Sequence, residues 1–405
     1  MDKRSNIANK LIYPFWADSI RLYENGISIF EDIDKVCKFG FGHPKGPFQM
    51  MDEIGLDTVY QGLRSFFDDT GDKRFKVPEV LRKMVEEGIL GEKTGKGFYN
   101  HIQQSPGRLK IDALHQEIPA IKVERVGVIG FGTMGRGIVQ VVAEHGFEVI
   151  VKEVRQDLIE KGMNFIEKIL ERSVEKGKIT AKGKNDIIGK IRGTTNSEGL
   201  KESDIVIEAA FEKMDLKKEI FAEIDMIVKP ECILATNTSC LSVSEMATVT
   251  KSPERFCGLH FFNPVPLMKL VEVIRAIQTS EEVFKKAFNF GIILGKEPVQ
   301  CKDSPGFIAN RLLCPYLFHA IGEYGKGLAT KKDIDNSVKL ETGFPMGPLE
   351  LTDLIGLDVC LDISEAMFKK TSDRNLDPPF LLKEMVRKGY LGKKSGKGFY
   401  DYSPI

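Results

Sequence analysis

Three glycines and a carboxylate form the first group of residues that could bind a ligand. Gly130, Gly132 and Gly135 follow an apolar run at 126–129. In a Gly-x-Gly-x-x-Gly turn the glycines allow a tight bend, close approach of a pyrophosphate and close packing of the next helix. Glu153 ends a second apolar run about 20 residues later, where a carboxylate accepts from a ribose 2′-hydroxyl and repels a 2′-phosphate. The pattern predicts NAD binding; NADP is disfavoured rather than excluded, since basic residues flank Glu153.

A histidine and a glutamate form the second group. Two apolar segments, 256–261 and 270–274, flank a turn that contains two prolines. If the segments pair antiparallel about this turn, His260 and Glu272 lie opposite one another and can touch. A carboxylate fixes the tautomer of an imidazole, which then suits the base that takes a hydroxyl proton during hydride transfer. A hydrogen-bonded structural histidine beside a surface glutamate is the alternative that the spacing leaves open.

An alternation of strands and helices carries both groups. Candidate strands lie at 125–129, 148–151, 205–209, 233–236, 256–261 and 270–274, with helical patterns between them. This order predicts an α/β Rossmann domain over 123–303, built on a doubly wound parallel sheet. The carboxyl ends of its strands are where a dinucleotide binds.

The rest of the chain is an internal repeat. Residues 7–100 align without a gap to residues 308–401, and about 40% of the positions are identical. Each copy has apolar residues at helical spacing, and Gly-Pro pairs at 46–47 and 347–348 precede further helical patterns. We therefore expect two homologous all-α domains at 1–101 and 304–405, which flank the Rossmann domain, with a linker at 102–122.

Five motifs occur together in this chain. They are Gly-Phe-Gly-Thr-Met-Gly at 130–135, Asn-Thr-Ser at 237–239, His-Phe-Phe-Asn-Pro at 260–264, Lys-Leu-Val-Glu-Val at 269–273 and Asp-Ser-Pro-Gly-Phe-Ile-Ala-Asn-Arg at 303–311. Together these motifs resemble the L-3-hydroxyacyl-CoA dehydrogenase family, and jointly they are far more specific than any one of them. The resemblance covers residues from about 123 to 405 and implies reversible, NAD-dependent oxidation of (S)-3-hydroxyacyl-CoA to 3-oxoacyl-CoA, in fatty-acid β-oxidation or short-chain acyl-CoA metabolism.

The resemblance also assigns roles to residues. His260 is the expected base, Glu272 the carboxylate that orients it, and Ser239 and Asn310 the groups that polarise the substrate oxygen, with Asn263 also at the substrate. The expected cofactor-binding residues are Gly130, Phe131, Gly132, Thr133, Met134, Gly135, Glu153, Ala210, Glu212, Lys217 and Asn237.

Simpler interpretations of some of these residues stay open. Ser239 could cap the helix expected near Val243, and Asn310 could brace its own helix. Glu212 and Lys217 could be ordinary charges at a solvated helix start. Basic residues of the long helix after Glu153 could meet the phosphates of CoA or form a solvated face. They are Lys161, Lys168, Arg172 and Lys176.

The N-terminal repeat departs from the family's usual two-domain order. It retains Asn9, the equivalent of Asn310, but has no dinucleotide domain of its own and hence no His–Glu pair, so we expect it not to catalyse. In the family the C-terminal domain builds the dimer interface. The two copies are therefore expected to pack as an intrachain pseudo-dimer in a monomer or loosely associated homodimer. Exchange of the extra copy onto another chain is the alternative.

Bulk composition narrows the class of protein. Acidic and basic residues are equal at 58 each, so nothing attracts the chain to nucleic acid. The seven scattered cysteines suit reduced thiols in a cytosol. No apolar run is of the kind that predicts a membrane span or a signal peptide. The histidines do not have the spacing of metal ligands. A cytoplasmic enzyme is expected. An NAD-dependent dehydrogenase of a small hydroxy acid without CoA, and a non-catalytic dinucleotide-binding scaffold, are the competing interpretations.

Overall fold

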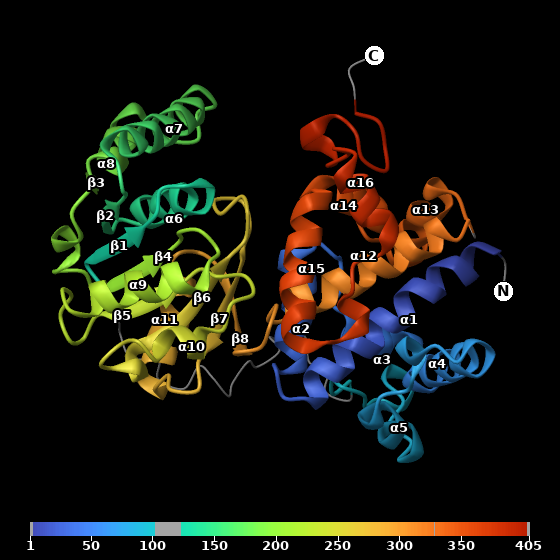
Figure 1. The fold of residues 1–405 in the computed structure, drawn as a ribbon. Coiled ribbons are helices and arrows are strands. Elements are labelled where there is room, and N and C mark those ends of the chain that lie inside the picture. The colour runs from blue at the N-terminus through green and yellow to red at the C-terminus, as the bar shows by residue number, and fades with distance from the viewer. Residues whose placement is uncertain (1–2, 102–122, 328, 403–405) are drawn as a thin grey trace. The chain divides into compact units, whose positions relative to one another are not determined.

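A computed structural model describes residues 3–101, 123–327 and 329–402, so the expected linker at 102–122 lies outside the described residues. The described chain forms two compact units. One joins both repeats, and the other carries the sheet, with the division at Pro305. Figure 1 shows the first unit in blue and orange-red, the two ends of the chain, and the second in the colours between them.

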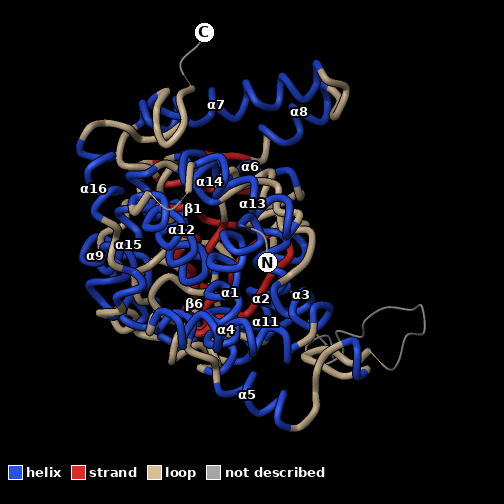
Figure 2. Tube along the Cα trace, turned by 90° about the vertical axis from the view of Figure 1, so that its right-hand side faces the viewer, coloured by secondary structure: helices blue, strands red, loops and turns tan. Residues whose placement is uncertain are grey.

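All eight named strands of the second unit belong to one sheet, and Figure 2 shows them in red, gathered together. They are β1 (Arg125–Ile129), β2 (Glu148–Lys152), β3 (Ile191–Thr194), β4 (Ile205–Glu208), β5 (Ile233–Thr236), β6 (Phe256–Phe261), β7 (Leu270–Arg275) and β8 (Glu297–Lys302). The order is β3-β2-β1-β4-β5-β6-β7-β8. The Rossmann fold predicted from the sequence is confirmed, since β1 lies between β2 and β4, with parallel pairing to both.

One pair of strands departs from parallel pairing. β6 and β7 are antiparallel about the proline-containing turn, and their register places His260 opposite Glu272, as the sequence predicts. The two edge strands, β3 and β8, were not predicted from the sequence. β3 has four residues, of which one is buried, and β8 contains Pro298, so neither has a strong strand signal.

Helices and single turns connect the strands. They are α6 (Thr133–Glu144), α7 (Gln156–Glu175), α8 (Ala181–Ile188), η4 (Ser197–Leu200), α9 (Met214–Asp225), α10 (Val243–Ala247), η5 (Pro253–Arg255) and α11 (Glu281–Ile293). Fully buried aliphatic side chains of β1 and β4 meet the apolar face of α6 in one core, which includes Val126, Ile138 and Ile205. This packing fixes where the carboxyl ends of β1, β4, β5 and β6 lie.

The two repeats fold alike. The first contains α1 (Lys3–Glu24), α2 (Phe30–Lys35), the π-helical turn η1 (Val36–Gly40), α3 (Pro47–Ile54), α4 (Leu56–Thr70), η2 (Lys73–Phe75), α5 (Glu79–Glu86) and η3 (Glu92–Thr94). The second contains α12 (Ala309–Gly325), α13 (Lys331–Thr342), α14 (Pro348–Ile355), α15 (Leu357–Thr371), η6 (Arg374–Leu376), α16 (Phe380–Arg387) and η7 (Lys393–Ser395). As predicted, Gly46-Pro47 and Gly347-Pro348 each begin a helix.

A buried aspartate makes the same contacts in each repeat. Asp34 accepts hydrogen bonds from the backbone of Phe48 and from the Tyr99 hydroxyl, and Asp335 accepts from Leu349 and Tyr400 in the same way. Such a carboxylate satisfies the free N–H groups at a helix start while it anchors the C-terminal loop of its copy. The two copies therefore share both their helices and the polar contacts that hold them.

The repeats pack against each other within one unit. α1 contacts both α12 and α13, and Figure 1 shows blue α1 beside orange α12 and α13. Phe15 of α1 lies 5.5 Å from its equivalent in α12, Tyr316, between ring centroids. The chain's one tryptophan, Trp16, is buried in α1 at 4% exposure. The described structure thus has the intrachain pairing that the repeat suggested.

The cysteines and the apolar character of the helices complete the description of the fold. All seven cysteines are buried and free. In the part of the chain that the structure describes, no helix combines the length and apolar character that a membrane span requires.

Candidate active site

The glycine turn joins β1 to α6 with the geometry that a dinucleotide requires. Gly130 has φ +95°, and a Cβ there would lie 2.7 Å from the carbonyl oxygen of Ala209. Gly135 packs so closely on Gly130 that a Cβ would collide with its carbonyl oxygen. Gly132 differs, because a Cβ there would meet nothing within 4 Å. The first and third glycines therefore serve the packing of the turn, while the second borders open space at the start of α6, where Thr133 and Met134 follow.

Glu153 follows β2 and stands beside this turn. Its carboxylate accepts the backbone N–H of Phe131 at 2.9 Å and that of Val154 at 2.7 Å. Each oxygen retains a lone pair after these bonds, so the carboxylate can still accept from a ribose hydroxyl. The Phe131 side chain is buried and packs on Gly162 of α7. Phe131 thus offers its backbone, rather than its ring, to the turn.

His260 lies between a carboxylate and a hydroxyl. Its Nδ1 is 2.7 Å from Oε2 of Glu272, and its Nε2 is 3.1 Å from Oγ of Ser239. Glu272 is fully buried, and His260 is 4% exposed. The carboxylate favours the tautomer with a proton on Nδ1, which leaves the Nε2 lone pair toward Ser239. This arrangement can remove a proton at Nε2 and stabilise the imidazolium through Glu272.

Glu212 holds the loop that carries Ser239 through hydrogen bonds. One carboxylate oxygen of Glu212 accepts from the Thr238 hydroxyl at 2.6 Å and from the backbone N–H groups of Ser239 and Cys240 at 2.8 and 3.2 Å. Desolvation raises the pKa of Glu212, but nearby Lys217 and these donors outweigh it, so the pKa is lowered. Glu212 is therefore charged at neutral pH, and its hydrogen bonds fix the position of Ser239 relative to His260.

A buried ion pair supports Glu212 in turn. Lys217 is 1% exposed, and its Nζ lies 2.6 Å from Glu208 and 3.4 Å from Glu212. Glu208 is fully buried and also accepts from the Ala210 N–H and the Thr236 hydroxyl. Lys217 is thus neither a solvated charge nor an accessible one in this structure. Its contact with the cofactor, like that of Ala210, stays a prediction.

The remaining expected site residues lie at different places. Asn237 follows β5, and its side-chain oxygen accepts the backbone N–H of Phe261, which ties β5 to β6 beside His260. Asn263 is exposed just after β6 and precedes a cis proline, Pro264. Asn310 lies in the first turn of α12, in the helical unit. The roles of these three asparagines toward cofactor or substrate stay predictions.

Some functional contacts were not found from the sequence. Ser242, rather than Ser239, caps α10 by accepting from the backbone of Glu245, so the capping interpretation of Ser239 was wrong. Glu208 was not singled out, although its place at the end of β4 beside the ligand edge is a signal that could have found it. The four basic residues of the α7 region are exposed and have no feature that sets them apart from a solvated face. They are Lys161, Lys168, Arg172 and Lys176.

Comparison with known proteins places both units in one family. The model of the 3-hydroxyacyl-CoA dehydrogenase NAD-binding domain matches residues 125–304. The model of the 3-hydroxyacyl-CoA dehydrogenase C-terminal domain matches twice, at 7–101 and 306–402. The match at residues 7–101 shows that the N-terminal repeat is a further copy of the C-terminal domain.

Whole proteins give the same result. The chain is 45% identical over 278 residues to a probable 3-hydroxybutyryl-CoA dehydrogenase of Deinococcus radiodurans, which covers 69% of this chain and 100% of the relative. Among solved structures, M. tuberculosis FadB2 matches with a TM-score of 0.67 at 45% identity, over 69% of this chain and 99% of that one. An (S)-3-hydroxybutyryl-CoA dehydrogenase from Ralstonia eutropha matches with a TM-score of 0.67 at 43% identity, over 70% and 100%.

Proposed function

Since the chain belongs to the 3-hydroxyacyl-CoA dehydrogenase family, whose first domain binds NAD, we propose that it oxidises (S)-3-hydroxyacyl-CoA reversibly to 3-oxoacyl-CoA. Its similarity to 3-hydroxybutyryl-CoA dehydrogenases favours short acyl chains. We place the reaction in short-chain acyl-CoA metabolism or fatty-acid β-oxidation. NAD is the cofactor, and the glycine turn with its open space at Gly132 and the carboxylate of Glu153 fit it.

The contact that carries the mechanism is the hydrogen bond between His260 Nδ1 and Glu272 at 2.7 Å. In the proposed reaction, His260 removes the 3-hydroxyl proton through Nε2. Bound nicotinamide supplies the acceptor for the hydride that leaves C3. Glu272 stabilises the imidazolium as it forms, and in the reverse direction the imidazolium returns the proton.

Ser239 completes this arrangement on the oxygen side. Its hydroxyl lies 3.1 Å from His260 Nε2. A substrate oxygen placed between these two groups could therefore form a hydrogen bond with each of them. A hydroxyl that polarises the developing oxygen charge contributes about 3 kcal/mol in comparable oxyanion sites. Asn310 is proposed as a second donor to the same oxygen, by the family resemblance.

The experiment that tests this function is NADH oxidation with acetoacetyl-CoA and, separately, with free acetoacetate. The proposal requires turnover of the CoA ester and a fall of about 100-fold or more in kcat for His260→Gln. Turnover of free acetoacetate at an equal rate would instead identify a dehydrogenase of small hydroxy acids. Binding of NADH without turnover of either compound would contradict the catalytic role.

A matched variant separates the role of His260 from a general effect of losing a histidine. His145 is exposed at the end of α6. His145→Gln should retain the parent kcat within about twofold. Equal losses in both variants would remove His260 from the mechanism.

A further inference from the structure

A pocket lies within the helical unit, where the two repeats meet. Its volume is about 220 Å³, and residues of α12, of the segment around η6 and of the first repeat line it. The lining residues are Arg74, Pro315, Phe318, His319, Arg374, Asn375, Asp377 and Pro379. A pocket of this size suits a molecule smaller than a typical drug-sized ligand.

The repeat explains why this space exists. In the first repeat, Arg21 projects from α1 toward the segment around η2. Its guanidinium donates to the Asp18 carboxylate at 2.7 Å and to the backbone carbonyl oxygens of Arg74 and Lys76 at 3.2 and 2.6 Å. The equivalent of Arg21 in the second repeat is Gly322, and a Cβ there would meet nothing within 4 Å. The second repeat therefore lacks the head group that fills this place in the first.

The groups that hold the Arg21 head group have equivalents in the pocket. The equivalent of Asp18 is His319, and the equivalents of Arg74 and Lys76 are Asn375 and Asp377. All three of these equivalents line the pocket. The residues at the three positions that hold the Arg21 guanidinium in the first repeat thus surround open space in the second.

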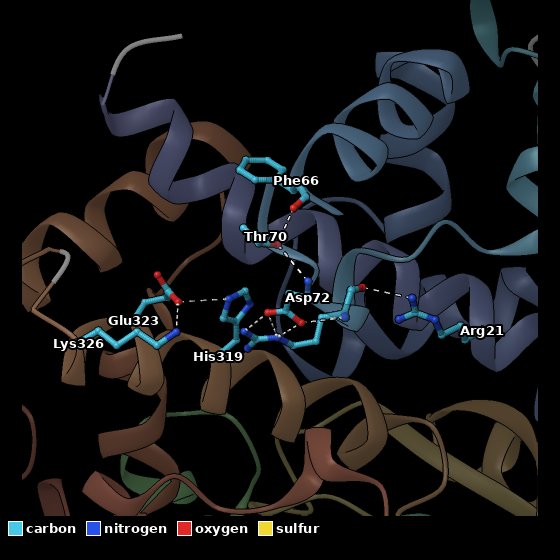
Figure 3. Close-up of polar contacts among 8 residues, drawn as sticks. Arg21, Phe66, Thr70, Asp72, His319, Glu323 and Lys326 are labelled. Atoms are coloured by element: carbon cyan, nitrogen blue, oxygen red, sulfur yellow. Dashed lines mark hydrogen bonds and ion pairs between the residues drawn. The ribbon is translucent and has the colours of Figure 1, made fainter. Parts of the chain in front are cut away.

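His319 can accept a hydrogen bond in this pocket. Its side chain is 4% exposed, and Nδ1 has no hydrogen-bond partner among the described residues. Burial, with Arg74 nearby, lowers the pKa of His319 to about 3, so the imidazole is neutral at pH 7. Figure 3 shows Nε2 toward Glu323, at 3.8 Å. That carboxylate favours the proton on Nε2, which leaves Nδ1 as an acceptor.

The pocket also has positive charge. No hydrogen bond or ion pair is found for the Arg374 guanidinium among the described residues, although it lines the pocket. Arg74 is held by Asp72 through two nitrogens, Nε and Nη2, and brings a second guanidinium to the same space. The carboxylate of Asp377 pairs with Lys383 at 3.3 Å. An anionic group of a ligand can therefore meet Arg374 with two-pronged geometry.

From this arrangement we propose that the pocket binds a small amphoteric molecule. A guanidinium or ammonium group takes the place of the Arg21 head group beside His319 and Asp377, and a carboxylate or phosphate meets Arg374. The ligand lies where both repeats contribute residues, so it stabilises their pairing by binding the folded state alone. This site is separate from the proposed dehydrogenase chemistry and does not depend on it.

Three small compounds test the proposal by calorimetry with the full chain. Guanidinoacetate has both groups, methylguanidinium has the cation, and acetate has the anion. Guanidinoacetate should bind with a Kd at least about tenfold below that of either half. Equal binding of all three compounds, binding of acetate alone, or no guanidinoacetate binding at millimolar concentration would overturn the proposal.

Substitutions at Gly322 and Arg374 test whether the ligand binds in this pocket. Gly322→Arg supplies the head group from the chain itself and should weaken guanidinoacetate binding at least about tenfold, whereas Gly322→Ala leaves the space open and should change it less than about twofold. Arg374→Gln should weaken guanidinoacetate binding about tenfold, and Arg387→Gln, on the exposed face of α16, should not. Circular dichroism verifies that each variant is folded. Unchanged binding in folded Gly322→Arg would place the ligand elsewhere.

Discussion

His43 and Phe344 stack face to face, with ring centroids 3.4 Å apart and an angle of 10° between the rings, although they occupy the same position in the two repeats. Their neighbours are related in the same way. A Cβ on Gly42 would lie 3.5 Å from Pro345, and one on Gly343 would lie 3.4 Å from Pro44. Reciprocal contacts of this kind are the mark of an isologous interface, here formed within one chain.

Burial of His43 makes the helical unit sensitive to acid. Desolvation lowers the pKa of His43 from 6.5 to about 3, so the unfolded chain binds more protons between these values. Stability is therefore lost as pH falls below 6.5, by about 2 kcal/mol for one histidine between pH 7 and pH 5. His43→Phe should remove this share of the loss. Urea unfolding at the two pH values, followed by circular dichroism, measures it.

Comparison of the two proteins at both pH values isolates His43 from other groups. Asp34, whose pKa burial raises to about 7, changes stability in the opposite direction, because the folded state then binds the extra proton. That contribution is common to both proteins and cancels in the difference. An identical loss in His43→Phe and in the parent would show that His43 is protonated while folded.

The internal pairing of repeats predicts a monomer. Because α1 covers α12 and α13 within the chain, the face that pairs in a symmetric dimer is already occupied. Sedimentation at micromolar concentration should show one chain per particle. A chain without residues 1–101 should form dimers or precipitate, since burial of that apolar face is lost. An obligate dimer of the full chain, or a stable monomer of the shortened one, would refute this account.

Glu272 is predicted to act through His260 rather than on substrate. Glu272→Gln preserves volume at a fully buried position but removes the charge that stabilises the imidazolium. We expect kcat to fall about 100-fold with little change in KM, together with a shift in the pH profile of kcat. Glu281→Gln, at an exposed surface ion pair with Arg275, is the matched control. A rise in KM alone would assign Glu272 to binding.

Glu212 is predicted to position Ser239. Glu212→Ala removes the acceptor of three donors from Thr238, Ser239 and Cys240. Ser239 is then no longer held in position beside His260, so kcat should fall about tenfold to 100-fold. Because Glu212 is also a predicted cofactor residue, NADH affinity is measured alongside by fluorescence titration. A loss confined to NADH affinity would make Glu212 a cofactor ligand only.

Local patterns predicted much of the fold and part of the site. The register that places His260 opposite Glu272 followed from a turn between two apolar segments, and the turn at Gly130 followed from glycine spacing. Lys217 could not be predicted in the same way. A lysine in an amphipathic helix ordinarily faces solvent, and the burial of Lys217 in α9 depends on its ion pair with Glu208 at the end of β4. Contacts between elements far apart in the sequence therefore stayed beyond the reach of local patterns, whereas a pair joined by a short turn did not.

The placement of Trp16 has a consequence for measurement. It is the chain's one tryptophan, and it lies buried in α1 of the helical unit, with the Tyr13 ring 5.4 Å away. Emission excited at the red edge of the indole band therefore originates in that unit alone, whereas the sheet unit is silent. The protein therefore has a built-in reporter for the melting of the helical unit alone, without any label.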